Sequence, residues 1–283
     1  MSRLNALAML LSAAIVTASA ITVEEYATMK PEEKIVALRG NPERSLDDPS
    51  KLLRLYTTGL RDTSPAVRRA AAQAAALLVG ALQNAQPKGK APTFSSEDSA
   101  AFQQALVSML IADDPGVRAP VASALAFSAS PNAATEDLLL ERVRVEPVPE
   151  IKAAIIEAMA QAGYQSPKLE AEAISLVQPN AGSKAIYTAS QVLALLRLES
   201  ALDELIAVAS KASPSQQHAL RALAAYGQAA DRAIPALERL VSDQKMPEDI
   251  RNLARITLEA VKAGKPRPSN LQSVNPVNLW PVA

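Results

Sequence analysis

The sequence predicts an all-α protein, a right-handed α-solenoid of about six stacked helix hairpins. Prolines recur at intervals of about one helix hairpin, and the apolar residues on both sides of them keep helical spacing. No stretch alternates in the manner of a β-strand, and only 9 of the 283 residues are glycine. Aromatic residues make up 3% of the chain, so its apolar content is mainly alanine, leucine, valine and isoleucine. Such residues suit closely packed repeat helices better than a compact enzyme core.

Six prolines mark the expected corners of the hairpins. Their spacings are 50, 34, 30, 35 and 33 residues, so all but the first lie near one period. Proline fits the first turn of a helix, because its missing N–H would have no partner there. A preceding Asp or Ser can cap the remaining N–H groups. The corner prolines are Pro65, Pro115, Pro149, Pro179, Pro214 and Pro247.

Three segments share one motif around these corners. Residues 62–78 (DTSPAVRRAAAQAAALL) and 113–125 (DDPGVRAPVASAL) read acid, short spacer, Pro, x, Val, Arg and an alanine-rich run. Residues 146–159 have Ile for Val and Lys for Arg. Because another helical run precedes each proline, each period is expected to be helix, tight turn, helix. One such hairpin cannot bury its apolar face alone, so several must stack.

This motif resembles HEAT repeats, in particular the short repeats of the bilin-lyase type. The resemblance covers residues 48–263, with a period shorter than the roughly 40 residues of long HEAT repeats. It implies that second helices line a concave face, and that acid and arginine side chains of successive repeats form a hydrogen-bonded ladder. The ladder residues it implies are Asp62 with Arg68, Asp113 or Asp114 with Arg118, and Asp243 with Arg251.

Some copies depart from the motif. Residues 180–183 (NAGS) follow Pro179, so the second helix of the fourth repeat is expected to start late. In the fifth repeat, Gln216 and Gln217 replace Val and Arg. Pro120 lies inside the second helix of the second repeat, and we expect it to kink that helix or delay its start.

The first twenty residues, MSRLNALAMLLSAAIVTASA, have the three parts of a secretory signal peptide. A positive start precedes an 11-residue apolar run, and small residues then lead to expected cleavage between Ala20 and Ile21. The run is shorter than the roughly 20 residues that span a membrane. We therefore expect a periplasmic or secreted protein with no membrane span in the mature chain.

The remaining segments outside the repeats are short. Residues 21–47 are expected to form a helical cap on the first repeat, and residues 84–96, rich in Pro, Gly, Lys and Ser, an insert loop. Residues 264–283 form a proline-rich C-terminal tail that holds the single tryptophan, Trp280. This residue is a candidate docking anchor, although it can equally fold back on the last repeat or hang free.

Candidate catalytic groups are scarce. Cysteine is absent, which excludes thiolate nucleophiles and Cys-based metal sites, and His218 is the single histidine. We interpret His218 as a partly exposed helix residue, and the paired carboxylates near helix starts as partners of the helix dipole. The sequence therefore predicts no catalytic residue, no cofactor and no metal site.

Charge gives a weak indication of the partner. Lys+Arg and Asp+Glu both number 29, and no aromatic stacking series is present, so nucleic acid is not expected. The second helices carry ten basic residues against five acidic ones, which would make the implied concave face suitable for an acidic protein segment or another anion. The alternative is that these side chains belong to the ladder or are solvated. The candidate partner-binding residues are Arg69, Lys152, Arg221, Arg255 and Trp280.

These features predict an exported scaffold that binds a protein on its concave face. Two alternatives remain open at this point. The first is an enzyme or enzyme accessory that resembles HEAT-like lyases or glycosylases, although those act inside the cell, which conflicts with the signal peptide. The second is a structural envelope protein without a discrete ligand. The identity of the partner and the oligomeric state are left open.

Overall fold

The computed structural model describes residues 21–39, 49–85, 94–128, 131–177, 183–196 and 199–264. The chain divides into two compact units, an N-terminal unit that ends at Pro131 and a C-terminal unit of residues 132–274. The described residues of both units form helices and turns and contain no strand. The predicted signal peptide and the C-terminal tail with Trp280 lie outside the described residues, so both stay predictions.

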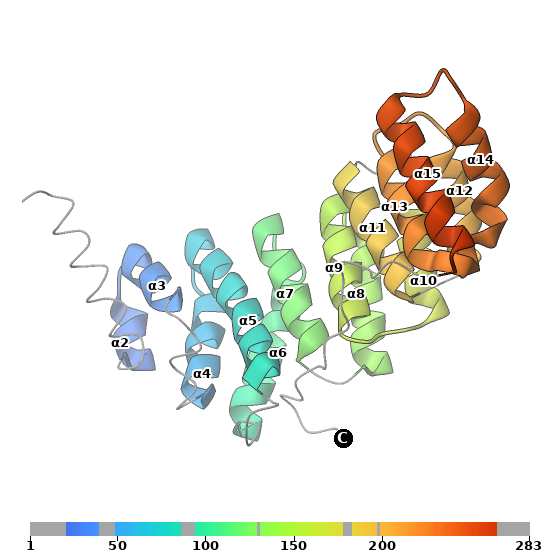
Figure 1. Ribbon diagram of the computed structural model, residues 1–283. Helices are drawn as coiled ribbons and strands as arrows, with labels where there is room; N and C mark the ends of the chain where they lie inside the picture. The colour runs from blue at the N-terminus through green and yellow to red at the C-terminus, as the bar shows by residue number, and fades with distance from the viewer. Residues whose placement is uncertain are drawn as a thin grey trace, which may run out of the picture. The chain divides into compact units, whose positions relative to one another are not determined.

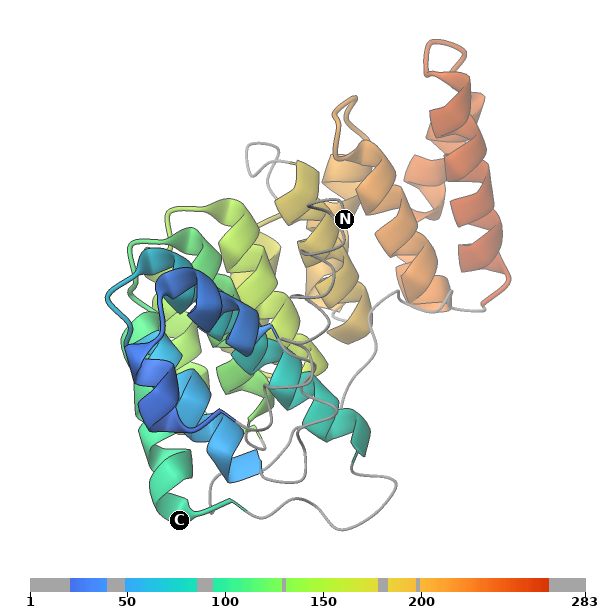
Figure 2. The same cartoon turned by 90° about the vertical axis from the view of Figure 1, so that its left-hand side faces the viewer.

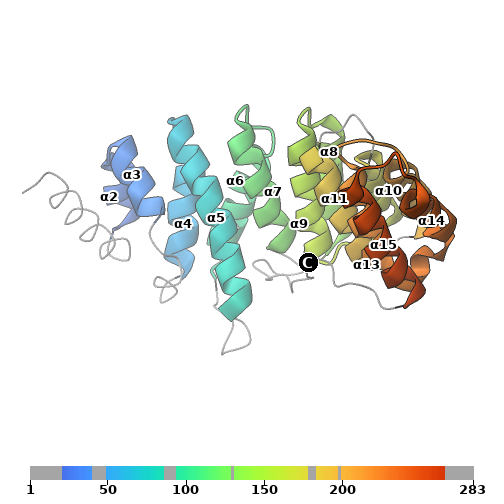
Figure 3. The same cartoon turned by 45° about the horizontal axis from the view of Figure 1, so that its top comes forward.

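The described part of the N-terminal unit contains three helix hairpins (Figure 1). Their first helices, α2, α4 and α6, pack in one layer, and their second helices, α3, α5 and α7, pack in another. Figure 3 shows these hairpins, blue to green, standing side by side. The hairpins are α2 (Val23–Thr28) with α3 (Pro31–Leu38), α4 (Pro49–Leu60) with α5 (Pro65–Ala85), and α6 (Ser96–Met109) with α7 (Pro115–Phe127).

The described part of the C-terminal unit contains four hairpins, whose second helices α9, α11, α13 and α15 pack one after another. Figure 2 shows the last two hairpins, orange and red, as neighbours. Two 3₁₀ segments, Glu199–Ala201 and Gly227–Ala233, join hairpins. The hairpins are α8 (Ala133–Val145) with α9 (Pro149–Gln161), α10 (Pro167–Ser175) with α11 (Ser183–Leu196), α12 (Leu202–Ala209) with α13 (Gln216–Tyr226), and α14 (Ile234–Ser242) with α15 (Glu248–Lys262).

This arrangement confirms the predicted HEAT-like helical repeat fold. The second helices α5, α7 and α9 begin at Pro65, Pro115 and Pro149, the three corners that carry the full motif. Pro214 and Pro247 instead stand just before α13 and α15. The helix that follows Pro179 starts only at Ser183, as its sequence predicted, although the proline itself lies outside the described residues.

Two local expectations need correction. The helix α7 starts at its corner proline and continues through Pro120, so the late start, one of the two effects expected of Pro120, does not occur. Pro120 is the sixth of the 13 residues of α7, and its ring removes one main-chain hydrogen bond from the helix interior. The insert is also shorter than residues 84–96, because Asn84 still belongs to α5 and Ser96 already begins α6. Residues 86–93 lie outside the described residues.

Small side chains allow the helices to approach closely. At Gly59 in α4, an added Cβ would lie 2.8 Å from the Cβ of Ala71 in α5 and 3.0 Å from the Oη of Tyr26. A larger residue there would push α4 away from its neighbours. The aromatic side chains of Tyr26, Tyr56, Phe102 and Tyr164 are fully buried. Burial raises the pKa of Tyr56 and of Tyr164 to about 12, so both stay neutral.

The segment before the first predicted repeat folds as a hairpin of the same kind. Thr22 caps α2, because its Oγ1 accepts from the N–H of Glu25 while its own N–H donates to the Glu25 carboxylate. The second helix of this hairpin begins at Pro31 and packs against α5. Its residue Lys34 reaches the next turn of the chain, which gives this segment a part in the site described below.

None of the helices in the described segments has the length and apolar character needed to cross a membrane.

Candidate functional site

Arginines of the repeat motif hold the turns of the N-terminal unit. Arg68 Nη1 donates to the main-chain oxygens of Asp62 and Thr63, both at 2.9 Å. Arg118 Nη1 makes the same pair of bonds to Ala112 and Asp113, at 2.8 and 2.9 Å. Each arginine lies three residues after its corner proline. The carbonyl groups at the end of a first helix lack helical partners, and the arginine supplies them with donors.

Successive hairpins of this unit are joined by ion pairs that start on the second helices. Lys34 Nζ of α3 lies 2.8 Å from Asp62 Oδ2 in the next turn. Arg69 Nε of α5 lies 2.8 Å from Asp114 Oδ2 in the turn after that. Asp62 and Arg68 therefore meet as the sequence implied, but through a main-chain oxygen, while the Asp62 carboxylate binds Lys34.

The third implied ladder pair, Asp243 with Arg251, is arranged differently. Arg251 Nη1 lies 3.3 Å from the side-chain oxygen of Gln244. The Asp243 carboxylate instead accepts from the main-chain N–H of Lys245 at 2.9 Å. In the turn between α14 and α15, Arg251 thus binds the side-chain amide of Gln244, at a position where the repeat motif would place an acid.

Both linking carboxylates are stabilised in their charged form. Burial alone would raise the pKa of Asp62, but the hydrogen bonds from Lys34 and from the Ser64 N–H hold it below its usual value. The hydrogen bond from Arg69 lowers the pKa of Asp114, whose carboxylate also caps α7 at the Gly116 N–H. Both aspartates are therefore ionised at neutral pH and already engaged within the fold.

The predicted partner-binding residues lie in different parts of the protein. Arg69 belongs to the N-terminal unit and is committed to Asp114. In the C-terminal unit, Lys152 is half-buried on α9 and Arg221 is exposed on α13. Arg255 is exposed on α15 and donates to Asn252 Oδ1 at 2.9 Å. Of the two exposed candidates in that unit, Arg255 is hydrogen-bonded within its own helix, so Arg221 is the better candidate for contact with a partner.

Arg221 stands in a row of polar side chains on successive second helices. The ring centroids of Tyr187 on α11 and His218 on α13 lie 5.0 Å apart in an edge-to-face contact. Burial raises the pKa of Glu157 on α9, and the positive charge of Lys184 on α11 opposes that rise. We refer to Glu157, Lys184, Tyr187, His218 and Arg221 as the second-helix row.

His218 is half-buried in this row. Burial lowers its pKa, and the neighbouring charge of Arg221 lowers it further. Its Nδ1 is buried and has no hydrogen-bond partner in the part of the chain that the structure describes. His218 is thus a neutral imidazole packed on a tyrosine, a pairing between residues 31 positions apart that the sequence pattern gave no means to predict.

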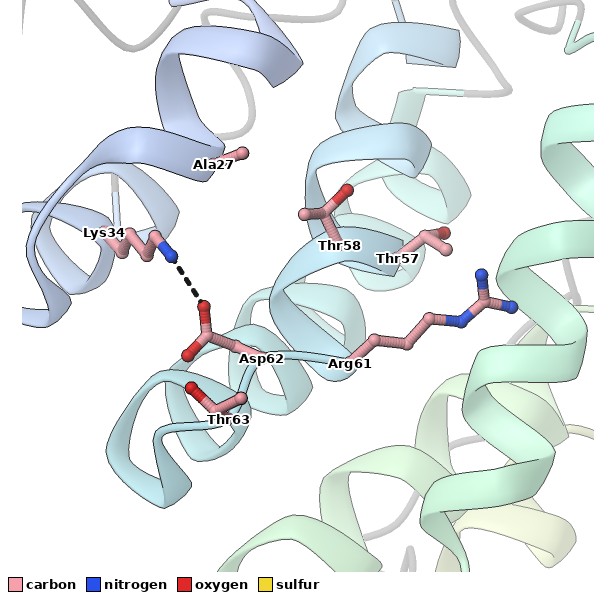
Figure 4. Close-up of a pocket in the computed structure, with 7 residues that line it drawn as sticks. All are labelled: Ala27, Lys34, Thr57, Thr58, Arg61, Asp62 and Thr63. Atoms are coloured by element: carbon pink, nitrogen blue, oxygen red, sulfur yellow. Dashed lines mark hydrogen bonds and ion pairs between the residues drawn. The ribbon is translucent and has the colours of Figure 1, made fainter.

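A different polar surface lies in the N-terminal unit, where the hairpin turns form it. One depression of about 360 Å³ lies between the first hairpin and the α4–α5 turn (Figure 4). A second, of about 390 Å³, lies between that turn and the α6–α7 turn. Arg61 and Asp62 line both. The remaining lining residues are Ala27, Lys34, Thr57, Thr58 and Thr63 in the first depression, and Leu60, Arg68, Ser108, Met109, Ile111, Ala112 and Asp113 in the second.

We refer to these two depressions together as the turn-edge surface. Figure 4 shows the Lys34–Asp62 pair on one side of the first depression, with the Arg61 side chain extending to the other side. Within the described residues, no group of three or more His, Asp or Glu side chains is arranged to hold a metal ion.

No family model matches the chain, and no curated protein matches it. Solved structures of helical repeat proteins are similar to it in fold. The karyopherin Kap121p bound to the SUMO protease Ulp1p is 11% identical, with a TM-score of 0.48 over 87% of this chain and 30% of that chain. Designed armadillo repeat proteins for modular peptide recognition are 19% identical, with a TM-score of 0.34 over 90% of this chain and 92% of that chain.

A third similar structure is the complex of CpcE and CpcF of phycocyanin lyase from Nostoc sp. PCC7120. It is 17% identical, with a TM-score of 0.35 over 83% of this chain and 95% of that chain. At such identities and TM-scores, these likenesses concern the general type of fold and carry no information about activity or partner.

Proposed function

We propose that this protein is an exported scaffold that holds a partner protein on the exposed face of its second helices and catalyses no reaction itself. Helical repeat folds are typical of protein-binding scaffolds, because stacked hairpins present an extended surface to which each repeat contributes side chains. The observation that carries the proposal is the second-helix row, in which the neighbouring helices α9, α11 and α13 each contribute polar side chains and the Tyr187 and His218 rings are in contact.

The chemistry of the row favours an acidic segment of the partner. Arg221 is exposed, and its side chain makes no hydrogen bond or ion pair within the described residues. Lys184 is also exposed, and it shares α11 with Tyr187, whose ring packs on His218 of α13. Tyrosine and arginine are enriched where protein interfaces bind most strongly, since both combine apolar area with directional hydrogen bonds.

The structure changes the choice of residues for a test. Reversing the charge of Arg69 would break its ion pair with Asp114, so a loss of binding there would report damage to the fold. Lys184 and Arg221 can be changed without removing an internal ion pair of that kind. The parts of Lys152, Arg255 and Trp280 in binding stay predictions.

A capture experiment tests the surface. The tagged protein is recovered with its partners from the envelope fraction of the exporting cell, beside the double variant Lys184→Gln/Arg221→Glu. The matched control is Arg239→Glu, an exposed arginine on the first helix α14 of the same unit. We expect wild type and control to retain one stoichiometric partner. The amount of that partner recovered with the double variant should be at least tenfold lower. Equal recovery with all three folded proteins would refute the second-helix row as the binding surface.

Export is tested separately from binding. If residues 1–20 act as a signal peptide, the mature protein should begin at Ile21. Mass spectrometry of the intact protein from the envelope fraction measures this directly. A chain that still carries Met1 and stays in the cytoplasm would contradict export without affecting the proposed binding surface.

A further inference from the structure

We infer that the turn-edge surface of the N-terminal unit is a separate docking site for an extended acidic peptide segment of a partner protein. In this proposal a carboxylate of the peptide binds Arg61, and a nearby apolar side chain of the same peptide packs on Ile111. The surface lies in a different unit from the second-helix row, so it adds a site to the proposed scaffold and can be tested independently of that row.

Arg61 is the cation around which the surface is built. It is exposed at the end of α4, where its main-chain N–H donates to the oxygens of Thr57 and Thr58 at 3.3 and 3.2 Å. Its side chain has no hydrogen bond or ion pair in the segments that the structure describes, and it lines both depressions. Figure 4 shows it extending away from the Lys34–Asp62 pair. The guanidinium is therefore available to a ligand from either side.

The surrounding charges favour a negatively charged ligand. Asp62 cannot neutralise Arg61, because its carboxylate accepts from Lys34 Nζ and from the Ser64 N–H, both at 2.8 Å. Arg68 is held by the turn carbonyls. With Lys34, the lining holds more cationic than anionic side chains, and a carboxylate is the planar anion that matches a guanidinium in two-point hydrogen bonding.

Ile111 supplies an apolar contact beside the charged one. It is 76% exposed in the α6–α7 turn, next to the half-buried Met109, and both line the second depression. Ile111 stands four residues before Pro115, and Arg61 stands four residues before Pro65. Neighbouring turns thus present first a cation and then an aliphatic side chain at the same position of the repeat. An extended peptide that crosses both turns would meet the two in succession.

The surface is held rigid by the bonds already described. Arg68 and Arg118 fix the two turns from within, and the pairs Lys34–Asp62 and Arg69–Asp114 join them to the neighbouring hairpins. A rigid site loses little conformational entropy when a peptide binds. A small free anion would use Arg61 alone, whereas a peptide would use Ile111 as well, and this difference allows the two ligands to be separated.

Selection of displayed peptides tests the proposal without knowledge of the partner. Random twelve-residue peptides are selected on the mature full-length protein, and the enriched sequences are synthesised and titrated by fluorescence anisotropy. We expect enrichment of Asp or Glu with an apolar residue a few positions away. Arg61→Glu and Ile111→Asp should each weaken binding at least tenfold, and binding should weaken as salt is raised.

Two matched controls accompany these variants. Leu77→Asp changes another exposed aliphatic side chain of the same unit, 64% exposed on α5, and Arg221→Glu changes the second-helix row. Both should bind the selected peptides within twofold of wild type, with unchanged helix content by circular dichroism. Enriched peptides without acidic residues, or equal binding to wild type and both turn-edge variants, would overturn the inference. Since capture through the second-helix row is measured separately, that outcome would leave the proposed function standing.

Discussion

In the N-terminal unit an arginine holds the end of each first helix of the motif-bearing repeats, whereas in the C-terminal unit a glutamine has the same role in one turn. Arg118, only 6% exposed, donates to the oxygens of Ala112 and Asp113. Gln216, also buried, donates from Nε2 to the oxygen of Ala209 at 2.9 Å. The free carbonyl groups at the end of a first helix thus need a donor, and that donor need not carry a charge. It need not stand at the motif arginine either, because Arg118 lies three residues after its corner proline and Gln216 only two.

The links from each second helix to the neighbouring hairpin differ in the same direction. In the N-terminal unit they are the ion pairs of Asp62 and Asp114. In the C-terminal unit, the Tyr226 hydroxyl donates to the Leu193 oxygen at 2.9 Å and the Thr257 hydroxyl to the Leu220 oxygen at 3.1 Å. Neutral hydrogen bonds do not depend on ionic strength, so these links of the N-terminal unit should be more sensitive to acid and salt than those of the C-terminal unit.

The largest effect is expected from removing the charged donor of the α6–α7 turn. Arg118→Met keeps most of the side-chain volume but leaves the oxygens of Ala112 and Asp113 without their donor. We expect a loss of about 3 kcal/mol in local stability. The contribution of a hydrogen bond from a charged donor and the cost of a buried unpaired carbonyl both reach this size. Hydrogen exchange of peptides from α6 and α7 measures it. Arg239→Met, at an exposed site, is the control and should change stability little.

Removing the neutral donor should cost less. Gln216→Leu leaves the Ala209 oxygen unpaired, and we expect a loss of about 1–2 kcal/mol in the exchange of α12 and α13. The loss should be the same at low and high salt. The neighbouring Gln217, whose half-exposed side chain donates to Asp249, provides the control Gln217→Leu. An equal effect of the two substitutions would show that the buried bond of Gln216 has no special part in the turn.

The comparison also shows what the sequence could predict of the fold. The proline corners and the helical spacing located every hairpin of the predicted repeats, because both act locally on the backbone. The partners of Arg68 were less accessible to prediction, since main-chain oxygens are present at every residue and leave no pattern. Gln216 looked like a loss of the motif and is instead a replacement donor.

The candidate sites were harder to predict than the fold. Basic residues on second helices were easy to identify, but the sequence did not show that Arg69 is engaged by an aspartate 45 residues away. The turn-edge surface was missed altogether. The sequence feature that could have indicated this surface is the position four residues before the corner proline, which Arg61 and Ile111 occupy and where both are exposed. Residues at a turn need no periodicity, so only knowledge of the stacking brings them together.

A smaller effect is expected from the acid-sensitive link of the N-terminal unit. The lowered pKa of Asp62 means that its contribution is complete above the pKa of an unfolded aspartate, about 3.9, and is lost as the pH falls through its folded value. Asp62→Asn should therefore cost about 1 kcal/mol at pH 7 and nothing at low pH, as measured by exchange in α3 and α4. Asp137→Asn, which removes the exposed pair with Lys168, should show no such dependence.

The smallest effect is expected in the C-terminal unit, which should respond to acid at a higher pH. His218 has a lowered pKa in the folded state, so the unfolded chain binds a proton more readily, and stability should fall as the pH drops below about 6.5. Because His218 is the single histidine, its NMR titration is free of overlap, and His218→Gln should abolish the change between pH 7 and pH 5.5. A folded pKa at or above 6.5 would mean that burial against Tyr187 does not disfavour the charged ring. The contrast in acid response between the two units would then rest on Asp62 and Asp114 alone.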